Sequence, residues 1–143
     1  MGEKMEAVKQ EVWDHLKESQ CVYLATAEAD QPRVRPVTLL DIDEKFWIAT
    51  TTRSAKARQI RRNPNVEFCL PLTAECGTGY IRVAGVAGVI TEQETRTAIG
   101  AKIPFIKDYW GTPDDPSFSL FRITRVEIEY LRPGEEYPTT FLV

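Results

Sequence analysis

The densest group of residues able to do chemistry lies in a basic segment that has no acidic side chain. Residues 46–66 lack aspartate and glutamate but carry five cations: Arg53, Lys56, Arg58, Arg61 and Arg62. The N-terminus of a helix presents unpaired N–H groups and a partial positive charge, which together favour a phosphate. A helix starting at Ser54 would place three hydroxyls (Thr50, Thr51, Ser54) and two cations (Arg53, Lys56) around such an anion.

A plainer interpretation of the same segment needs no ligand. Ser54 would then only cap the helix, and the basic residues would form a solvated face. Arg61 and Arg62 suit the C-terminal end of the helix dipole and fit this interpretation best.

A second unusual feature is Pro36 inside the strand-like run 33–42. Proline cannot donate to a β-ladder, so Pro36 marks an edge, a bulge or a point where pairing stops. Backbone groups beside it would then be free to face a ligand. An ordinary edge strand protected by proline is the alternative.

The elements that must position these residues are mostly consecutive strands. Met5, Val8, Val12 and Leu16 repeat at helical spacing and predict an amphipathic first helix. Strands are expected at 21–27, 33–42, 46–50, 66–70, 80–90 and 118–131, with a bulge at Gly85 or Gly88. Helices are expected at 54–62 and after a capping box at 91–94, with an irregular loop at 107–116. The order predicts one mainly antiparallel β domain over 1–143, a small barrel with peripheral helices.

Composition narrows the classes of function. With 43% hydrophobic and 27% charged residues the chain is an ordinary globular protein, and its net charge of −3 argues against nucleic acid or anionic membrane as partner. No secretory signal or membrane-spanning run is present in the sequence. Cys21, Cys69 and Cys76 lack metal-site spacing, so we expect reduced thiols and a cytoplasmic protein, with Cys21 and Cys69 as small core residues.

Several catalytic constellations are missing. His15 is the only histidine and lies on the expected first helix, so a Ser-His-Asp triad would need it to reach a distant serine. No ligand set for a metal is recognisable, and no acid or base has to be catalytic. Catalytic residues are therefore left unassigned, which suits a reaction carried by a cofactor.

Taken together, these pieces resemble the pyridoxamine 5′-phosphate oxidase-like superfamily of FMN-binding split β-barrels. The resemblance runs from about Val22 to about Ile90 and rests on the order of short motifs: Gln31-Pro32, Arg35-Pro36-Val37, Thr50, Ser54-Ala55-Lys56, Gln59-Ile60 and Asn63-Pro64-Asn65-Val66. The late loop with Tyr109-Trp110 and Asp114-Asp115-Pro116 is similar to the small general-stress-protein branch.

The resemblance implies roles for the matching residues in strands. Arg35 would lie towards the phosphate and ribityl side of the flavin. The backbone of Pro36, Val37 and Thr38 would line the isoalloxazine ring, and Thr50 would contact the cofactor.

In the helix, Ser54 and Lys56 match phosphate-binding positions. Ala55 departs from a frequent arginine, and Arg53 is the candidate to replace it. Leu40 departs from a lysine near the ring, and Tyr80 replaces a glutamine that reaches the flavin from the other subunit. Trp110 would flank the ring from that subunit, or else is a core or interface aromatic.

The implied function is an FMN-dependent oxidoreductase acting with an unknown small-molecule redox partner. The chain lacks the C-terminal arginine-histidine signature of the vitamin-making oxidase, so pyridoxamine phosphate is not the expected substrate. The alternatives are a non-catalytic flavin-binding stress or sensor protein, or a split barrel using a deazaflavin or haem. Because a small filled barrel has no interior room for a flavin ring, we expect a homodimer with the flavin at the subunit interface.

Overall fold

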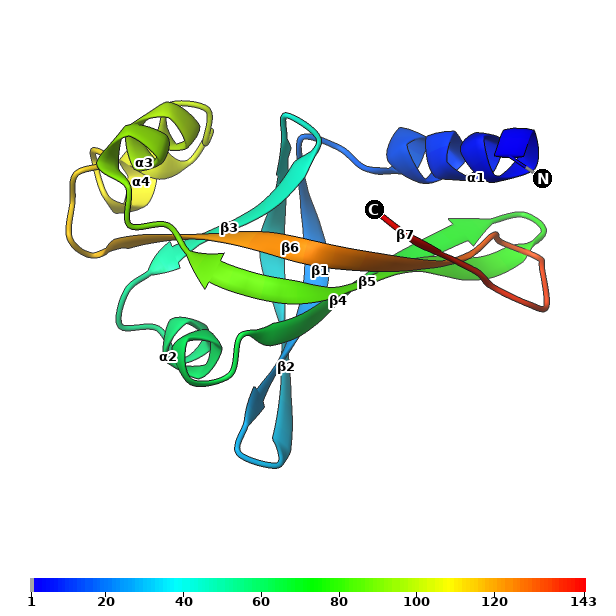
Figure 1. Ribbon diagram of the computed structural model, residues 1–143, viewed down its shortest axis with the longest axis horizontal. Coiled ribbons are helices and arrows are strands. Elements are labelled where there is room, and N and C mark those ends of the chain that lie inside the picture. The colour runs from blue at the N-terminus through cyan, green and yellow to red at the C-terminus, as the bar shows by residue number, and fades with distance from the viewer. Residues whose placement is uncertain (1) are drawn as a thin grey trace.

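A computed structural model describes residues 2–143, which contain seven strands and four helices (Figure 1). The strands are β1 (Ser19–Glu28), β2 (Gln31–Ile42), β3 (Lys45–Thr51), β4 (Asn65–Ala74), β5 (Gly77–Val89), β6 (Phe118–Leu131) and β7 (Thr139–Leu142). The helices are α1 (Gly2–His15), α2 (Ala55–Arg62), α3 (Gln93–Gly100) and α4 (Ile106–Tyr109).

The strands form one antiparallel sheet in the order β3-β2-β1-β4-β5-β6-β7, and β3 also pairs with β6 to close a barrel. The closure is incomplete, because β2 and β3 pair only at three positions next to their connecting turn, 40–42 with 45–47. This is a split barrel, as predicted. The ladder between β5 and β6 shifts register between Ala84 and Val86, so a bulge does occur at Gly85, with the extra residue in the facing part of β6.

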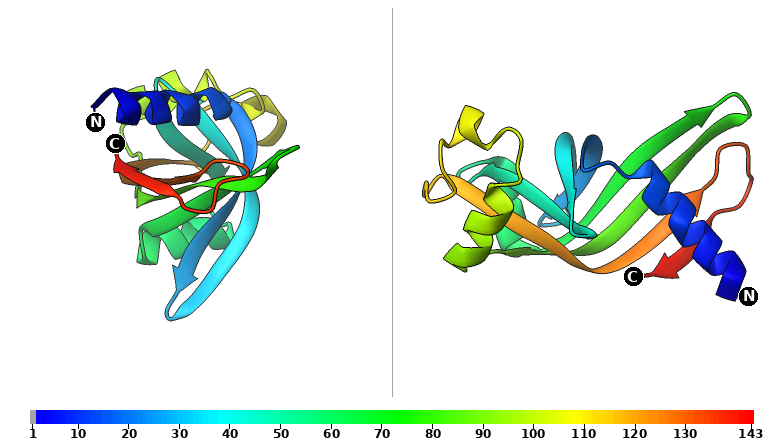
Figure 2. Two further views of the ribbon diagram at one scale, coloured as in Figure 1. Left: turned by 90° about the vertical axis from the view of Figure 1, so that its right-hand side faces the viewer. Right: turned by 90° about the horizontal axis from the view of Figure 1, so that it is seen from above.

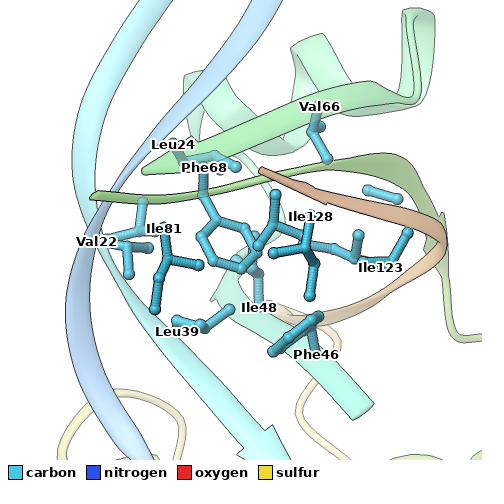
Figure 3. Close-up of a cluster of buried hydrophobic side chains, with 14 of the residues drawn as sticks. Val22, Leu24, Leu39, Phe46, Ile48, Val66, Phe68, Ile81, Ile123 and Ile128 are labelled. Carbon is cyan, nitrogen blue, oxygen red and sulfur yellow. The ribbon is translucent and has the colours of Figure 1, made fainter. Parts of the chain in front are cut away.

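Alternation along the strands fills the barrel with apolar side chains. Figure 3 shows this cluster, with residues of six strands turned towards one another: Val22, Leu24, Leu39, Phe46, Ile48, Val66, Phe68, Ile81, Ile123 and Ile128. A second buried cluster joins β2, β3 and β6 to α3 and α4, and includes Trp47, Ile103, Trp110 and Phe118. The right-hand view of Figure 2 shows α3 and α4 at one end of the molecule and α1 at the other.

A polar clamp holds α1 against the end of β6. Arg132 donates to both carboxylate oxygens of Glu11, at 2.7 Å each, and the Tyr130 hydroxyl donates to the same carboxylate at 2.6 Å. The bonds from Arg132 and Tyr130 lower the pKa of Glu11 to about 2. Val12 of α1 and Leu16, the residue that follows the helix, are buried in the barrel cluster.

Three details differ from the sequence expectations. β7 was not expected; it is a four-residue edge strand pairing with β6 from Tyr130 back to Glu127. The predicted capping box does not form, because Glu92 is the N-cap of α3 and its side chain makes no capping bond. Cys21 is exposed because the alternation of β1 turns Val22 and Leu24 inward, and Cys69 is half-buried because β4 turns Val66 and Phe68 inward.

Among residues 2–143, none of the helices is long and apolar enough to cross a bilayer.

Candidate functional site

The split between β2 and β3 opens a hollow of about 480 Å³, within the size range of small-molecule pockets, roughly 300–1,000 Å³. Beyond the three paired positions, residues 36–38 of β2 and 49–51 of β3 face this hollow without pairing to each other. The other edge of β3 is paired, because its residues 46–51 form a ladder with β6. The lining consists of Pro36, Val37, Thr38, Ala49, Thr50, Thr51, Lys56, Phe105, Asp108, Tyr109 and Trp110.

Pro36 lies where β2 has only one neighbour. Residues 31–39 of β2 pair with β1, and Pro36 is opposite Tyr23, whereas pairing with β3 begins only at Leu40. Of the alternatives that Pro36 left open, the structure therefore bears out an edge position: the ladder with β1 runs through Pro36, and its other side is unpaired. The open edges leave backbone groups available to a ligand that lies between the strands.

The N-terminus of α2 adjoins the hollow, and Ser54 caps it as the sequence predicts. The Ser54 Oγ accepts a hydrogen bond from the N–H of Ala57 at 3.2 Å, and its hydroxyl shares a second bond with the Thr50 hydroxyl at 3.1 Å. This pair of bonds fixes the end of β3 relative to the first turn of the helix. Thr50 is itself buried.

The connection from β3 to α2 is braced from β6. The N–H of Thr52 donates to the Ser117 carbonyl at 2.7 Å, and Arg61 donates to the Thr52 carbonyl at 3.0 Å and to the Ser119 hydroxyl at 3.2 Å. Arg61 therefore does more than favour the helix dipole, and nothing local in the sequence indicates this contact. The brace holds the N-terminal turn of α2 in place beside the hollow.

Two cations lie together near this turn without an acidic partner. Within residues 2–143 neither Arg35 nor Lys56 forms a salt bridge, and Arg35 donates only to neutral acceptors, the Leu24 carbonyl at 3.2 Å and the Gln59 Oε1 at 2.6 Å. Burial lowers the pKa of Lys56, and the charge of Arg35 lowers it further. Burial also lowers the pKa of Arg35, with a contribution from Arg33. Adjacent, partly buried cations that are not neutralised by a carboxylate make this end of the hollow a candidate anion site.

Aromatic side chains form the opposite wall. Phe105, Tyr109 and Trp110 have ring centroids 5.4–6.3 Å apart. Tyr109 is 70% exposed, whereas Trp110 is only 8% exposed and packs on Phe118 with a centroid distance of 5.0 Å. Trp110 thus lines the hollow of its own chain as part of the second buried cluster.

The structure brings most of the predicted residues to one place. Pro36, Val37, Thr38, Thr50, Thr51, Lys56 and Trp110 line the hollow. Ser54 adjoins it through Thr50, and Arg35 through its proximity to Lys56. Arg53 is exposed and outside the lining, and Tyr80 bonds to Glu129 at 2.6 Å, also outside the lining of its own chain.

Four residues at or beside the hollow were not predicted from the sequence. Ala49, Phe105 and Asp108 line it, and Gln59 holds Arg35. Gln59 belongs to one of the motifs that carry the family resemblance, but that motif does not predict which residues Gln59 contacts in the fold.

These features define a class: a small split β-barrel with a hollow at the split, a candidate anion site beside it and an aromatic wall. The family model described as pyridoxamine 5′-phosphate oxidase matches residues 8–132. Because that match spans most of the chain, the protein belongs to the pyridoxamine 5′-phosphate oxidase family.

Individual relatives agree with this assignment. The chain is 28% identical over 134 residues to General stress protein 26 of Bacillus subtilis (strain 168), covering 93% of this chain and 94% of that protein. The structure of a NimC/NimA family protein from Clostridium acetobutylicum is similar with a TM-score of 0.76 and 27% identity, covering 94% and 91% of the two chains. A haem-binding protein from Mycobacterium smegmatis shares the fold, with a TM-score of 0.70 at 16% identity, covering 87% of this chain and 53% of that one.

Proposed function

We propose that this protein binds FMN in the hollow between β2 and β3. The observation that carries the proposal is the pair of cations, Arg35 and Lys56, that lack an acidic partner beside the capped N-terminus of α2. A phosphate at that position would gain the helix N–H groups and two charge-assisted contacts. Flavin is also the usual cofactor of the family to which the chain belongs.

The remaining walls suit the rest of such a cofactor. The unpaired edges at 36–38 and 49–51 would supply backbone donors and acceptors to the polar rim of a planar ring. Tyr109 and Trp110 would cover an apolar face of that ring. When bound, FMN supplies hydride and single-electron transfer, and the protein's part is to orient the ring and shape the space beside it.

The proposed activity is oxidation or reduction of a small molecule. Asp108 is the only acidic residue in the lining, and it is exposed. The described lining therefore offers no buried carboxylate as a catalytic acid or base, which is consistent with chemistry carried by the cofactor. A flavin-binding store or sensor without turnover is the alternative, and oxidation of reduced nicotinamide with an added acceptor separates the two.

Haem and deazaflavin are the other candidate cofactors. The residues lining the hollow include no histidine, cysteine or methionine, and Tyr109 is the one side chain of a type that ligates haem iron. The lining thus suits a phosphate-bearing flavin better than haem. The visible spectrum of the purified protein distinguishes the three cofactors.

We further propose that two chains associate with the flavin sites at their interface. Tyr23, Val34 and Pro36 are exposed on the hairpin of β1 and β2, which projects from the rest of the sheet in Figure 1. Tyr23 and Pro36 are cross-strand neighbours, so they present one apolar outer face beside the hollow. A second chain packed there would bury that face and close the open side of the site.

Titration of FMN into the apo-protein tests the phosphate site. Lys56→Ala removes a charge-assisted contact worth about 1.5–3 kcal/mol, so the affinity should fall roughly ten- to a hundredfold. Arg62→Ala, on the same helix but outside the lining, is the matched control and should bind like the wild type. Equal affinities for Lys56→Ala and the wild type would contradict the proposed site.

A further inference from the structure

Gln59 lies on α2 beside Arg35 and uses both ends of its amide. Its side chain is buried, with the residue only 4% exposed. The Oε1 atom accepts two hydrogen bonds, from the Thr26 hydroxyl at 2.6 Å and from the Arg35 Nη2 at 2.6 Å. The Nε2 atom donates to the Glu28 carboxylate at 2.9 Å. These bonds join β1, β2 and α2 at one buried point.

The chemistry of the neighbours permits one orientation of this amide. A guanidinium can only donate, and an ionised carboxylate can only accept. Rotating the amide by half a turn would set Nε2 against Arg35 and Oε1 against Glu28, so both contacts would be lost. Glu28 keeps its charge at neutral pH, because the bond from Gln59, with Arg33 and Arg58 nearby, lowers its pKa.

Gln59 also keeps Arg35 apart from the carboxylate. The Glu28 carboxylate forms ion pairs with Arg33 and Arg58, each with an N···O distance of 3.8 Å. Arg35 instead donates to two neutral oxygens, the Gln59 Oε1 and the Leu24 carbonyl. The guanidinium is therefore held in one position without being neutralised. A direct ion pair with Glu28 would fix the same side chain but cancel the charge that an anion needs.

We infer that Gln59 is the positioning residue of the anion site, which holds the Arg35 guanidinium towards the cofactor phosphate while insulating it from Glu28. This inference rests on the proposed function and deepens it. Gln59 touches no ligand itself. Its effect passes through Arg35, and hence falls on the phosphate of the cofactor and not on the ring.

Comparing FMN with riboflavin isolates the phosphate. Gln59→Leu should weaken FMN about tenfold, the size of one charge-assisted hydrogen bond, and leave riboflavin within about twofold of the wild type. Thr26→Val is the matched control, since it removes the other bond to the same Oε1 but leaves the bond to Arg35. It should keep the wild-type preference for FMN. An equal loss for both ligands in Gln59→Leu, or a loss of preference in Thr26→Val, would overturn the inference.

A second measurement does not depend on any ligand. In ¹⁵N spectra of the apo-protein, the two terminal nitrogens of Arg35, assigned with Arg35→Lys, should give separate signals in the wild type and in Thr26→Val. They should average to one in Gln59→Leu. Averaged signals in the wild type, or separate ones in Gln59→Leu, would refute the positioning role.

Gln59→Glu covers the case in which Gln59→Leu does not fold. It keeps an oxygen towards Arg35, so the signals should stay separate, but its charge neutralises the guanidinium and the preference for FMN should fall. Averaged signals or an unchanged preference in this variant would count against the inference. If the wild type binds FMN and riboflavin equally, the proposed phosphate site is wrong, and the spectra alone decide the role of Gln59.

Discussion

Replacing Glu11 with glutamine should lower the free energy of unfolding, because it removes the negative charge from the polar clamp between α1 and β6. The ordinary pKa of 4.5 and the value of about 2 in the folded protein correspond to at most ~3.4 kcal/mol of stability at neutral pH. The Glu11 side chain is 35% exposed, so solvent screening reduces this to about 1–2 kcal/mol. Urea denaturation at pH 7 should show that difference between the wild type and Glu11→Gln.

The pH dependence gives the sharper test of the same reasoning. A carboxylate whose pKa is lowered by folding stabilises the protein above its unfolded pKa and loses that contribution as the pH falls towards the folded value. The difference between wild type and Glu11→Gln should therefore shrink below pH ~4.5 and be less than half its neutral value at pH ~3. Glu6→Gln, on the same helix and 75% exposed, is the control and should cost under about 0.5 kcal/mol. A difference that stays constant from pH 7 to pH 3 would refute the assignment of the clamp to the Glu11 charge.

Two further predictions concern the bulge and the assembly. Gly85→Ala should cost about 1–3 kcal/mol in urea denaturation, because the new Cβ would lie 2.6 Å from the Ile123 Cγ2 and 2.8 Å from the Thr124 carbonyl, whereas Gly88→Ala meets nothing within 4 Å and should be nearly neutral. Equal stabilities of these two variants would contradict the packing argument. Light scattering of the FMN-loaded protein should give about twice the 16.3 kDa of one chain, and Val34→Asp should lower that mass. A flavin-loaded wild type at 16.3 kDa would exclude the proposed dimer.

Local patterns predicted the parts of this fold that local physics determines. β6 begins and ends at the expected residues, Phe118 and Leu131, although its burial does not alternate throughout: residues 118–121 are all buried and residues 124–125 are both exposed. Ser54 caps α2 since its side chain needs only an N–H three residues on. The position of Pro36 was likewise informative, because a missing N–H restricts pairing wherever the strand lies.

Long-range contacts account for what the sequence did not predict. The start of α3 is set from the late loop, where Gln93 donates to Asp114 at 2.6 Å and Arg96 to the Pro113 carbonyl at 3.0 Å, and these bonds take precedence over the local capping box. Thr26 and Glu28 reach Gln59 across more than thirty residues. The spacing of hydrophobic residues does not predict such partners, so the hydrogen bonds around Gln59 could be identified only from the three-dimensional structure.

The aromatic wall has a consequence for how this protein can evolve. Trp110 faces the hollow with one side and the second buried cluster with the other, so a change that reshapes the pocket at this position also removes packing from Phe118. A substitution at Tyr109 would remove little packing, because most of its surface is exposed. Natural substitutions that alter ligand preference with little loss of stability should therefore occur at Tyr109 and the exposed residues beside it. Trp110 should vary less, because its replacement would also destabilise the fold.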